Sequence, residues 1–333
     1  MPKFFLLMNP SARSFESGKD WMKIFEILRA RNVGFDFGFT EKGGDSGFIV
    51  QNAIRSGFDT IVAVGGDGTI NETINCLFGP EEDRARATMG VIYTGTSPDF
   101  CRYHKIPLNT EVAINLLLSG QKTKVDVCRI QHYETPNGKP VSRIFSCSSN
   151  FGLGAAVARG ANSGLRKRWG DSLGTFLSLV SAIYSYRPSV FRLKITGRPA
   201  KTSPSGRFAG LGAPGTPPSL DGRENCFHNV FNIFIGKNPI VASGIKLKMD
   251  ISHDDGRLYI LPLHGISRTR VLGYLPHAYT GSIAKWFPPI FASEVEILTG
   301  DENLEVEYDG DPRGFLPAKI KVLPKALELV RAA

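Results

Sequence analysis

A glycine-rich turn between an apolar run and a helical segment carries the strongest chemical signal in this sequence. Residues 61–64 are a short apolar, β-branched run typical of a buried parallel strand, and Gly65-Gly66-Asp67-Gly68 follows directly. The next ten residues place apolar side chains at helical spacing: Ile70, Ile74, Leu77 and Phe78. Glycines let a backbone approach a ligand closely, and free N–H groups at a helix start favour phosphate. The segment predicts a phosphate-binding turn in which the Asp67 carboxylate works through a cation.

Four other segments accompany this turn along the chain. They are Asn9-Pro10-Ser11-Ala12, Gly95-Thr96-Ser97-Pro98-Asp99-Phe100, His253-Asp254-Asp255-Gly256-Arg257-Leu258 and Tyr308-Asp309-Gly310-Asp311-Pro312. A Gly-Gly-Asp-Gly turn by itself can serve only to connect a strand to a helix. In this order and at these separations, the five segments resemble the diacylglycerol kinase catalytic-domain family, which includes soluble bacterial lipid kinases, sphingosine kinases and ceramide kinases. The resemblance extends over nearly the whole chain.

The resemblance implies ATP as the phosphate donor and Mg²⁺ as a cofactor. The nucleotide contacts of the family carry over onto these positions: Asn9, Thr40, Gly65, Gly66, Asp67, Gly68, Thr69, Ile70, Asn71, Glu72 and Thr96. Thr40 and Thr96 also have a chemical reason, because each lies at the end of a strand-like run and could meet a nucleotide at the carboxyl edge of an open sheet. Without the family, each threonine would be interpreted as a turn or N-cap residue.

Two positions depart from the family pattern. Pro98 stands where the family has asparagine, so an amide side chain and a backbone donor are both missing. Asp311 stands where the family has a glutamate proposed as proton acceptor, and its side chain is one methylene shorter. We expect Asp311 to be the general base, with Asp309 as the alternative and Asp67 orienting magnesium. On the residues alone, an acidic pair on a hairpin loop indicates a solvated turn.

The segment that begins at His253 has a different implied role. In the bacterial enzymes of the family this turn holds a structural magnesium ion, and oxygen-only ligation suits that hard cation. Carried over, the ligands are the Ser252 carbonyl, the Asp255 carboxylate and the Arg257 carbonyl, with His253 a bystander. The alternative is an Asp-Gly hairpin turn that needs no metal ion.

Length and composition indicate a soluble globular protein. The chain has 333 residues, 42% hydrophobic and 21% charged, which is enough for two domains with cores. Its five cysteines are odd in number and include no Cys-x-x-Cys pair, which suits reduced cytosolic thiols. Residues 2–8 are too short for a signal peptide, and residues 176–184 fall short of the ~20 apolar residues that span a bilayer. We expect a cytoplasmic protein, peripherally associated with the membrane.

The net charge is +9, and much of the excess lies in residues 155–200, which hold eight Lys or Arg against Asp171 alone. Part of this segment combines adjacent cations with aromatic side chains suited to an anionic membrane surface: Arg166, Lys167, Arg168, Trp169 and Phe176. Nucleic acid could bind such a patch, and a solvated helix face is the plain alternative. The family resemblance favours a lipid substrate at an anionic membrane and no nucleic-acid partner. The oligomeric state is open, a homodimer included.

The order of the predicted elements indicates the fold. Strands and helices alternate over residues 3–8, 18–31, 33–39, 45–56, 60–64, 69–78, 88–93 and 110–119, which indicates a parallel sheet covered on both faces. From residue 124 the pattern is β-rich, with strands at 124–132, 141–150, 189–196, 230–235, 246–249, 258–263 and 294–298, and a helix at about 173–186. The tail alternates with period two on both sides of a turn at Asp309-Gly310.

We therefore predict the α/β class with two domains. Residues 1–123 form an N-terminal Rossmann-like parallel-sheet nucleotide domain, and residues 124–316 form a C-terminal antiparallel β-sandwich domain for the lipid substrate. By resemblance, the C-terminal segment of about 317–333 returns to the first domain. Residues 197–225 are rich in glycine and proline and are predicted to be a flexible surface insertion.

Three functions compete for this sequence. A lipid kinase that phosphorylates diacylglycerol or a related lipid explains all five segments and the basic segment. An NAD kinase shares the Gly-Gly-Asp-Gly loop, but it would carry a second Asn-Glu well downstream, whereas Asn71-Glu72 lies within the loop. A nucleotide- or lipid-binding protein with weak catalysis is the third, motivated by Pro98 and Asp311. The P-loop pattern Gly-x-x-x-x-Gly-Lys-[Ser/Thr] does not occur.

Overall fold

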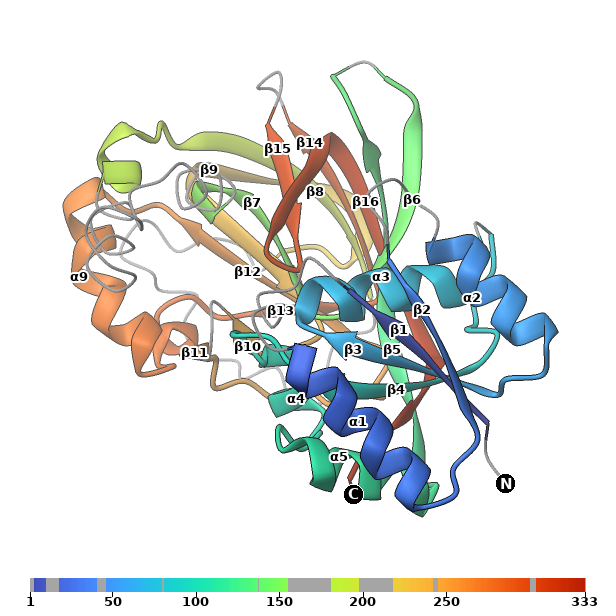
Figure 1. Ribbon diagram of the computed structural model, residues 1–333. Helices are drawn as coiled ribbons and strands as arrows, with labels where there is room; N and C mark the ends of the chain where they lie inside the picture. The colour runs from blue at the N-terminus through green and yellow to red at the C-terminus, as the bar shows by residue number, and fades with distance from the viewer. Residues whose placement is uncertain are drawn as a thin grey trace.

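The computed structural model describes residues 3–9, 18–40, 46–79, 81–136, 138–154, 181–197, 218–241, 245–299 and 304–332. In this part of the chain one continuous sheet holds 14 strands, and the short strands β10 (Ile240–Val241) and β11 (Ile245–Lys246) form a separate ribbon. Figure 1 shows the parallel end of the sheet with its helices beside the antiparallel end, and strand β16 between them. Within the described residues, none of the helices combines the length and apolar character needed to cross a membrane.

The first part of the chain alternates strands and helices, as predicted. The elements are β1 (Phe4–Met8), α1 (Gly18–Ala30), β2 (Phe35–Phe39), α2 (Ser46–Arg55), β3 (Thr60–Gly65), α3 (Asp67–Leu77), β4 (Thr88–Tyr93), α4 (Asp99–Tyr103) and α5 (Thr110–Ser119). The four strands pair in parallel in the order β4-β3-β1-β2. β1, β3 and β4 are buried along their whole length, which explains why their sequences are apolar runs without alternation.

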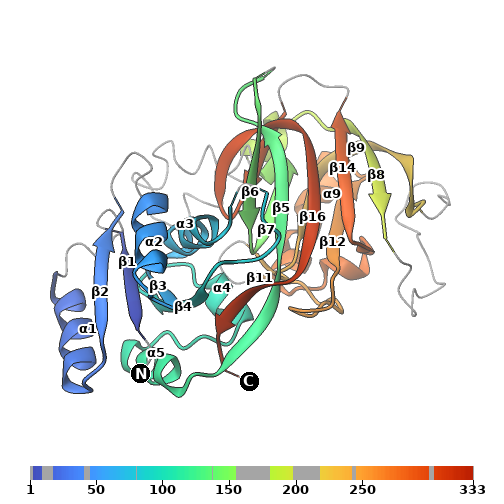
Figure 2. The ribbon, with the colours of Figure 1, turned by 90° about the vertical axis from the view of Figure 1, so that its right-hand side faces the viewer.

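Alternate side chains of β1 enter two different helix–sheet layers. Leu7 packs in one core with Ile74 of α3, whereas Leu6 packs in another with Ile24 of α1. This follows from the pleat of a strand, which sends successive side chains to opposite faces. Figure 2 shows α2 and α3 above the parallel strands and α5 below them. The sheet is covered on both faces, as the alternation of elements predicts.

The second part of the chain is mainly antiparallel. Its larger elements are β5 (Lys122–Tyr133), β6 (Pro140–Phe145), β7 (Ser148–Gly152), β8 (Ser189–Thr196), β9 (Asp221–Gly236), β12 (Leu258–His264), α9 (Arg268–Tyr279), η2 (Ile283–Lys285), β13 (Ile290–Ala292), β14 (Glu294–Thr299) and β15 (Glu305–Tyr308). In β8 the buried Phe191, Leu193 and Ile195 alternate with Arg192 and Lys194, as expected where one face of a sheet meets the core. The predicted fold class is confirmed: a parallel α/β region followed by an antiparallel β region.

Strand β16 (Asp311–Val330) connects the two regions. It pairs antiparallel with β15, β14 and β5, and near its end Leu329 lies beside Met89 of β4 in parallel. The strand begins at the turn Asp309-Gly310, whose residues have φ angles of 50° and 92°. A two-residue hairpin turn requires such positive φ values. The predicted turn is confirmed, and one strand links it to the parallel sheet.

The predicted strand at residues 141–150 is wrong in one respect, because the structure divides it into β6 and β7. Between them, the N–H groups of Ser146 and Cys147 donate hydrogen bonds to the carboxylate of Asp309 instead of to a neighbouring strand. A side chain from a distant part of the chain therefore separates the two strands, and no local pattern reveals this.

Several other predicted boundaries differ from the structure. β9 begins at Asp221 and pairs with the end of β8, so residues 221–225 of the predicted insertion lie in a strand. The strand predicted at 246–249 reduces to the short β11. Helix α9, which contains Pro276, is absent from the sequence prediction. Residues 198–217 of the insertion, most of the helix predicted at 173–186 and the basic segment 159–169 lie outside the described residues.

Candidate active site

The carboxyl ends of the four parallel strands lie at one edge of the sheet. Met8 pairs with Phe39 on one side and with Val64 on the other, and Gly65 pairs with Tyr93. The residues that follow these strand ends are therefore neighbours. They include the predicted nucleotide-binding residues Asn9, Thr40, Gly65, Gly66, Asp67, Gly68 and Thr96.

Backbone hydrogen bonds fix two of these loops to the strand ends. The N–H of Thr40 donates to the carbonyl of Met8 at 2.8 Å, and the N–H of Thr94 donates to the carbonyl of Gly65 at 3.0 Å. Thr40 is buried, whereas Thr96 is exposed. Thr96 is thus the more open of the two hydroxyl groups that the sequence places at this edge.

Two glycines at this edge, Gly65 and Gly95, are packed more closely than a residue with a side chain would allow. A Cβ atom on Gly65 would lie 2.2 Å from Oγ1 of Thr69, and one on Gly95 would lie 2.5 Å from Cα of Gly66. Helix α3 begins at Asp67, and its N-cap Gly66 supplies no side-chain hydrogen bond. The first-turn N–H groups of a helix have no partner within the helix, so those of α3 suit an anionic phosphate group.

Part of the predicted nucleotide-binding set also makes contacts within the protein. The side chain of Ile70 is buried in the core, and its N–H donates to the carbonyl of Gly66 at 3.0 Å. Glu72 accepts a hydrogen bond from the hydroxyl of Ser46 at the start of α2. Asn71 is buried and binds Asp309. These three side chains hold α3 in place.

Asp67 lies in a buried and negatively charged environment at this edge. Its Oδ1 atom is buried and, among the described residues, has no hydrogen-bond partner. Burial, together with the negative charges of Asp99 and Asp309, raises the pKa of Asp67 to about 7, although Arg102 and the N–H of Asp99 offset part of this effect. A carboxylate beside other carboxylates, with one oxygen uncompensated, fits a cation such as Mg²⁺.

Asp309 connects α3 to the antiparallel region. Its carboxylate accepts hydrogen bonds from Nδ2 of Asn71 at 2.7 Å, from the N–H of Cys147 at 2.9 Å and from the N–H of Ser146 at 3.2 Å. Burial raises the pKa of Asp309, although these three hydrogen bonds favour its charged form. Three hydrogen bonds from the protein thus hold the buried Asp309 carboxylate between α3 and the 146–147 backbone.

Helix α3 makes a second attachment to the antiparallel region one turn later. Nδ2 of Asn75 donates to the carbonyl of Ile144, and Oδ1 of Asn75 accepts from the N–H of Ile144, both at 2.8 Å. The Asn75 side chain thereby pairs with β6 as a neighbouring strand would. The helix that carries Asp67 is thus fixed to the antiparallel region at two successive turns, through Asn71 and Asn75.

Asp311 is placed differently from Asp309, although both lie at the same hairpin. The Asp311 side chain is 55% exposed and contacts Nη2 of Arg313 at 2.9 Å. The buried Glu307 holds the turn between them, because its Oε1 accepts a hydrogen bond from the N–H of Gly310 at 2.7 Å. Burial is the main reason that the pKa of Glu307 is raised to about 7. The structure thus presents Asp311 on a fixed turn with its carboxylate open to solvent.

The residues predicted to ligate a structural magnesium ion lie around a lysine side chain. Nζ of Lys237 donates to Oδ1 of Asp255 and, at 2.8 Å, to the carbonyl of Arg257. The N–H of Ser252 donates to Oδ2 of Asp255 at 2.9 Å. Burial acts to raise the pKa of Asp255, but the hydrogen bonds from Lys237, Ser252 and Arg257 outweigh it and hold that pKa below its usual range. His253 instead contacts Nη1 of Arg331 through Nε2, at 2.7 Å.

Three polar residues near the site are absent from the sequence prediction. They are Asp126, Lys237 and Asn238, each almost wholly buried. Asn238 donates from Nδ2 to the carbonyl of Asp99 at 3.0 Å and so fixes the loop beside Asp67. The sequence did contain a signal for these residues. Asp126 interrupts the apolar run of β5, and Lys237 and Asn238 directly follow β9. Charged residues inside apolar runs are rarely buried without a partner.

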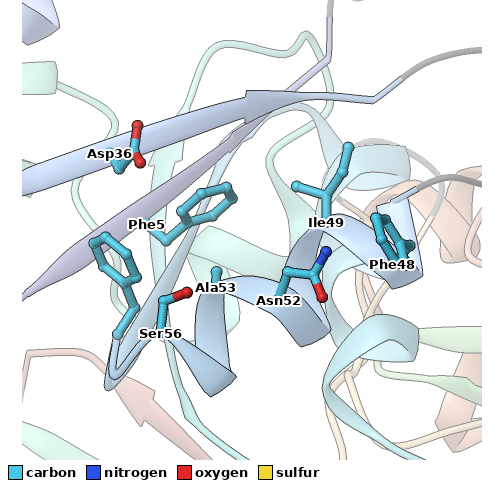
Figure 3. A pocket seen from close by; sticks show the side chains of 8 residues that line it. Phe5, Asp36, Phe48, Ile49, Asn52, Ala53 and Ser56 are labelled. Atoms are coloured by element: carbon cyan, nitrogen blue, oxygen red, sulfur yellow. The ribbon is translucent and has the colours of Figure 1, made fainter.

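A surface recess of about 290 Å³ lies away from these residues, between α2 and the strands β1 and β2. Figure 3 shows Phe5, Phe48 and Ile49 on its walls, with Asp36 as the one charged side chain among the lining residues. Its walls hold neither a cationic group nor any predicted site residue. We therefore place the candidate active site at the carboxyl edge of the sheet and not in this recess.

Comparison with known protein families divides the chain into two matching parts. Residues 3–130 match the family described as the diacylglycerol kinase catalytic domain. Residues 147–331 match the family described as the YegS C-terminal NAD kinase beta sandwich-like domain. The first match contains the glycine turn and Asp67, and the second contains the turn at Asp309-Gly310.

Individual relatives agree with these matches. A diacylglycerol kinase of Staphylococcus epidermidis is 33% identical over 331 residues, covering 97% of this chain and 90% of that protein. The crystal structure of a diacylglycerol kinase from Bacillus anthracis superposes with a TM-score of 0.69 at 22% identity, covering 99% of this chain and 97% of that one. Yeast NADH kinase complexed with NADH gives a TM-score of 0.52 at 11% identity, covering 100% and 84%. At these identities the two superpositions show a shared fold.

The raised pKa of Asp67 predicts that the free energy of unfolding decreases as the pH rises. Because the folded pKa of about 7 lies above the ordinary value of 3.8, folding favours the protonated acid, and stability should fall as the pH rises through this interval. Asp67→Asn cannot ionise. We expect this variant to match the wild type near pH 4 and to exceed its free energy of unfolding by ~1–3 kcal/mol near pH 8, measured by denaturant unfolding. An equal difference at both pH values would contradict the burial of the charge.

Proposed function

The chain belongs to the diacylglycerol kinase catalytic-domain family, and from this we propose that it is an ATP-dependent lipid kinase acting on a hydroxyl of diacylglycerol or a related lipid. The observation that carries the proposal is the arrangement at the carboxyl edge of the sheet. There a helix start without a side-chain cap and the uncompensated Oδ1 of Asp67 lie beside closely packed glycine loops. Such an edge suits the phosphate groups of a nucleotide.

The protein's part in phosphoryl transfer is mainly positioning and charge compensation. The first-turn N–H groups of α3 hold the phosphates, and Asp67 orients the cation that accompanies them. Bound Mg²⁺ offsets the phosphate charge. Among the described residues no three His, Cys, Asp or Glu side chains form a metal-binding group.

The acceptor hydroxyl needs a base in line with the phosphate. Its oxygen forms a bond to the γ-phosphorus, the bond from phosphorus to the ADP oxygen breaks, and the hydroxyl proton passes to a carboxylate. We assign this base to Asp311, which is exposed, rather than to Asp309, whose oxygens accept hydrogen bonds from three groups of the protein. Arg313 contacts the Asp311 carboxylate through Nη2 at 2.9 Å and leaves most of that side chain exposed.

The two alternatives have less support. The likeness to yeast NADH kinase concerns the fold, whereas the match over residues 3–130 is to the diacylglycerol kinase catalytic domain. The departure at Pro98 motivates a binding protein without catalysis. However, Pro98 precedes the first turn of α4, where Asp99 and Arg102 form an ion pair at 3.4 Å beside Asp67. Pro98 therefore leaves the Asp99–Arg102 ion pair of this loop intact.

We further propose that the protein works at the membrane surface, docked by the basic segment 159–169. The proposal rests on sequence alone, because this segment lies outside the described residues. A lipid substrate reaches a water-soluble active site only at an interface, and cations with aromatic neighbours bind anionic headgroups.

The proposed function predicts ATP-dependent phosphorylation of a lipid. Purified protein should transfer labelled phosphate from ATP to at least one member of a panel of diacylglycerol, monoacylglycerol, ceramide, sphingosine and phosphatidylglycerol. Asp67→Asn should abolish this transfer while remaining folded, because Asp67 lies on a ligand-facing turn. NAD is included in the panel. Phosphorylation of NAD alone would favour the NAD kinase alternative, and no turnover with retained ATP binding would favour a binding protein.

Membrane docking should depend on charge. Replacing Arg166, Lys167 and Arg168 by Gln should weaken co-sedimentation with anionic vesicles, and raising salt should weaken wild-type binding because charges are screened over about 8–10 Å near physiological ionic strength. The matched control replaces three exposed cations of the helices α1 and α2 by Gln: Lys23, Arg29 and Arg55. Two results would contradict membrane docking by this segment: an equal loss of vesicle binding in both triple variants, or equal binding of the wild type to neutral and anionic vesicles. Either would favour the alternative of a solvated helix face.

Assignment of the base is tested at the hairpin. Asp311→Asn should lower kcat by about 10²-fold or more, because a general base contributes that much, while ATP binding and the melting temperature stay near wild type. Asp311→Glu should also impair turnover, since a shift of ~1 Å can cost about 10²-fold. Asp309→Asn should mainly lower the melting temperature, because three buried hydrogen bonds end on that carboxylate. If Asp311→Asn is fully active while Asp309→Asn is stable but inactive, the general base is Asp309 and not Asp311.

A further inference from the structure

A buried lysine lies among the oxygen atoms that the sequence resemblance assigns to a structural magnesium ion. Lys237 directly follows β9, and its side chain is 1% exposed. Its Nζ donates to Oδ1 of Asp255 and, at 2.8 Å, to the carbonyl of Arg257, which are two of the three predicted magnesium ligands. The third contact is Oδ2 of Asp126 in β5, at 2.7 Å.

These contacts satisfy the lysine completely. An ammonium group carries three N–H donors and no acceptor, and Nζ has three oxygen partners here. A magnesium ion bound to the same carboxylate and carbonyl would need both oxygens at about 2.0–2.1 Å. It would then lie against the ammonium group, and two cations in contact in a buried site repel strongly. The residues present therefore do not fit a magnesium ion at this turn.

The charges of the site also balance without a metal. Asp126 and Asp255 supply two negative charges, Lys237 supplies one positive charge, and Arg257 supplies another through Nη2, which lies 2.8 Å from Oδ2 of Asp255. A divalent cation would add an uncompensated double charge next to a side chain that is 1% exposed. Burying an unpaired charge is strongly unfavourable.

The remaining lone pairs of the two carboxylates are occupied by the backbone. Asp126 accepts from the N–H of Gly256 at 2.7 Å and from the N–H of Lys325 in β16 at 2.8 Å. Asp255 accepts from the N–H of Ser252 at 2.9 Å. The site is thus a closed network with a cation at its centre, built from β5, β16, the end of β9 and the 252–257 turn.

We infer that the ε-ammonium group of Lys237 is the structural cation of this protein: it takes the place that a magnesium ion would occupy at the 252–257 turn, and the protein binds no metal ion there. The cation is covalently part of the chain, so this network does not respond to magnesium concentration. The inference is independent of the proposed lipid kinase activity.

The network also bears on the candidate active site. Asn238 is the residue after Lys237, and its Nδ2 donates to the carbonyl of Asp99, which lies beside Asp67. Its Oδ1 accepts from the N–H of Ile240 at 2.8 Å, so both ends of the amide are fixed. Two consecutive residues thus take part in different contacts, Lys237 in the network of the 252–257 turn and Asn238 in the Asp99 loop.

The test compares two neutral substitutions by thermal unfolding in EDTA and in millimolar MgCl₂, without nucleotide. Lys237→Ala removes the cation and leaves room, whereas Lys237→Met removes the charge but fills the space. Both should melt lower than wild type in EDTA, on the order of 5–10 °C, because two buried carboxylates lose their partner. MgCl₂ should recover about half of this loss in Lys237→Ala, because the vacated oxygens now form a magnesium site. It should not stabilise Lys237→Met.

The wild-type protein tests the inference even if Lys237→Ala does not fold. We expect the wild-type melting temperature to be the same in EDTA and in MgCl₂. A saturable magnesium stabilisation of the wild type that disappears in Asp255→Asn would overturn the inference, since the metal would then share the site with the lysine. The inference is equally wrong if Lys237→Ala melts at the wild-type temperature in EDTA, or if MgCl₂ stabilises Lys237→Met as much as Lys237→Ala.

Discussion

The buried carboxylate of Asp309 is the constraint on which the rest of the structure depends. It lies at the meeting point of α3, the break between β6 and β7, and the hairpin that starts β16, and it binds one group from α3 and two from the break. A charge in such a place is tolerated only when hydrogen bonds compensate it, so all three elements must keep their relative positions. The helix that carries Asp67 is thereby fixed relative to the turn that carries Asp311.

The two regions of the chain are joined by buried polar groups as well as by apolar contacts. β16 extends from the hairpin to the edge of β4, and on the way its Lys325 N–H binds the same Asp126 that holds Lys237. Polar networks of this kind are directional, because each donor needs its acceptor at a defined angle and distance. These networks add directional contacts to the apolar core and the strand pairings that the two regions share.

The electrostatics of the candidate site contrast with those of the whole chain. The protein has a net charge of +9, yet the negative charges of Asp99 and Asp309 repel the charged form of Asp67 at the carboxyl edge of the sheet. Burial and this repulsion raise the pKa of Asp67, and under the proposed function a cation bound with the nucleotide would offset both effects. At the 252–257 turn, by contrast, a positive charge of the chain itself, the ammonium group of Lys237, compensates the carboxylate of Asp255.

The sequence by itself determined the local features of this protein. The buried strands β1, β3 and β4 follow from apolar runs, the turn after β3 from its glycines, and the hairpin at Asp309-Gly310 from period-two alternation around an Asp-Gly pair, because each depends on residues close together in the chain. Only the tertiary structure decided which polar groups meet. It separated Asp309, which is buried, from Asp311, which is exposed, broke one predicted strand at Ser146, and brought Lys237 to the oxygens assigned to a metal ion. These contacts join residues far apart in sequence, so no local pattern encodes them, and burial, which sets their charge and hydrogen bonding, exists only once the chain has folded.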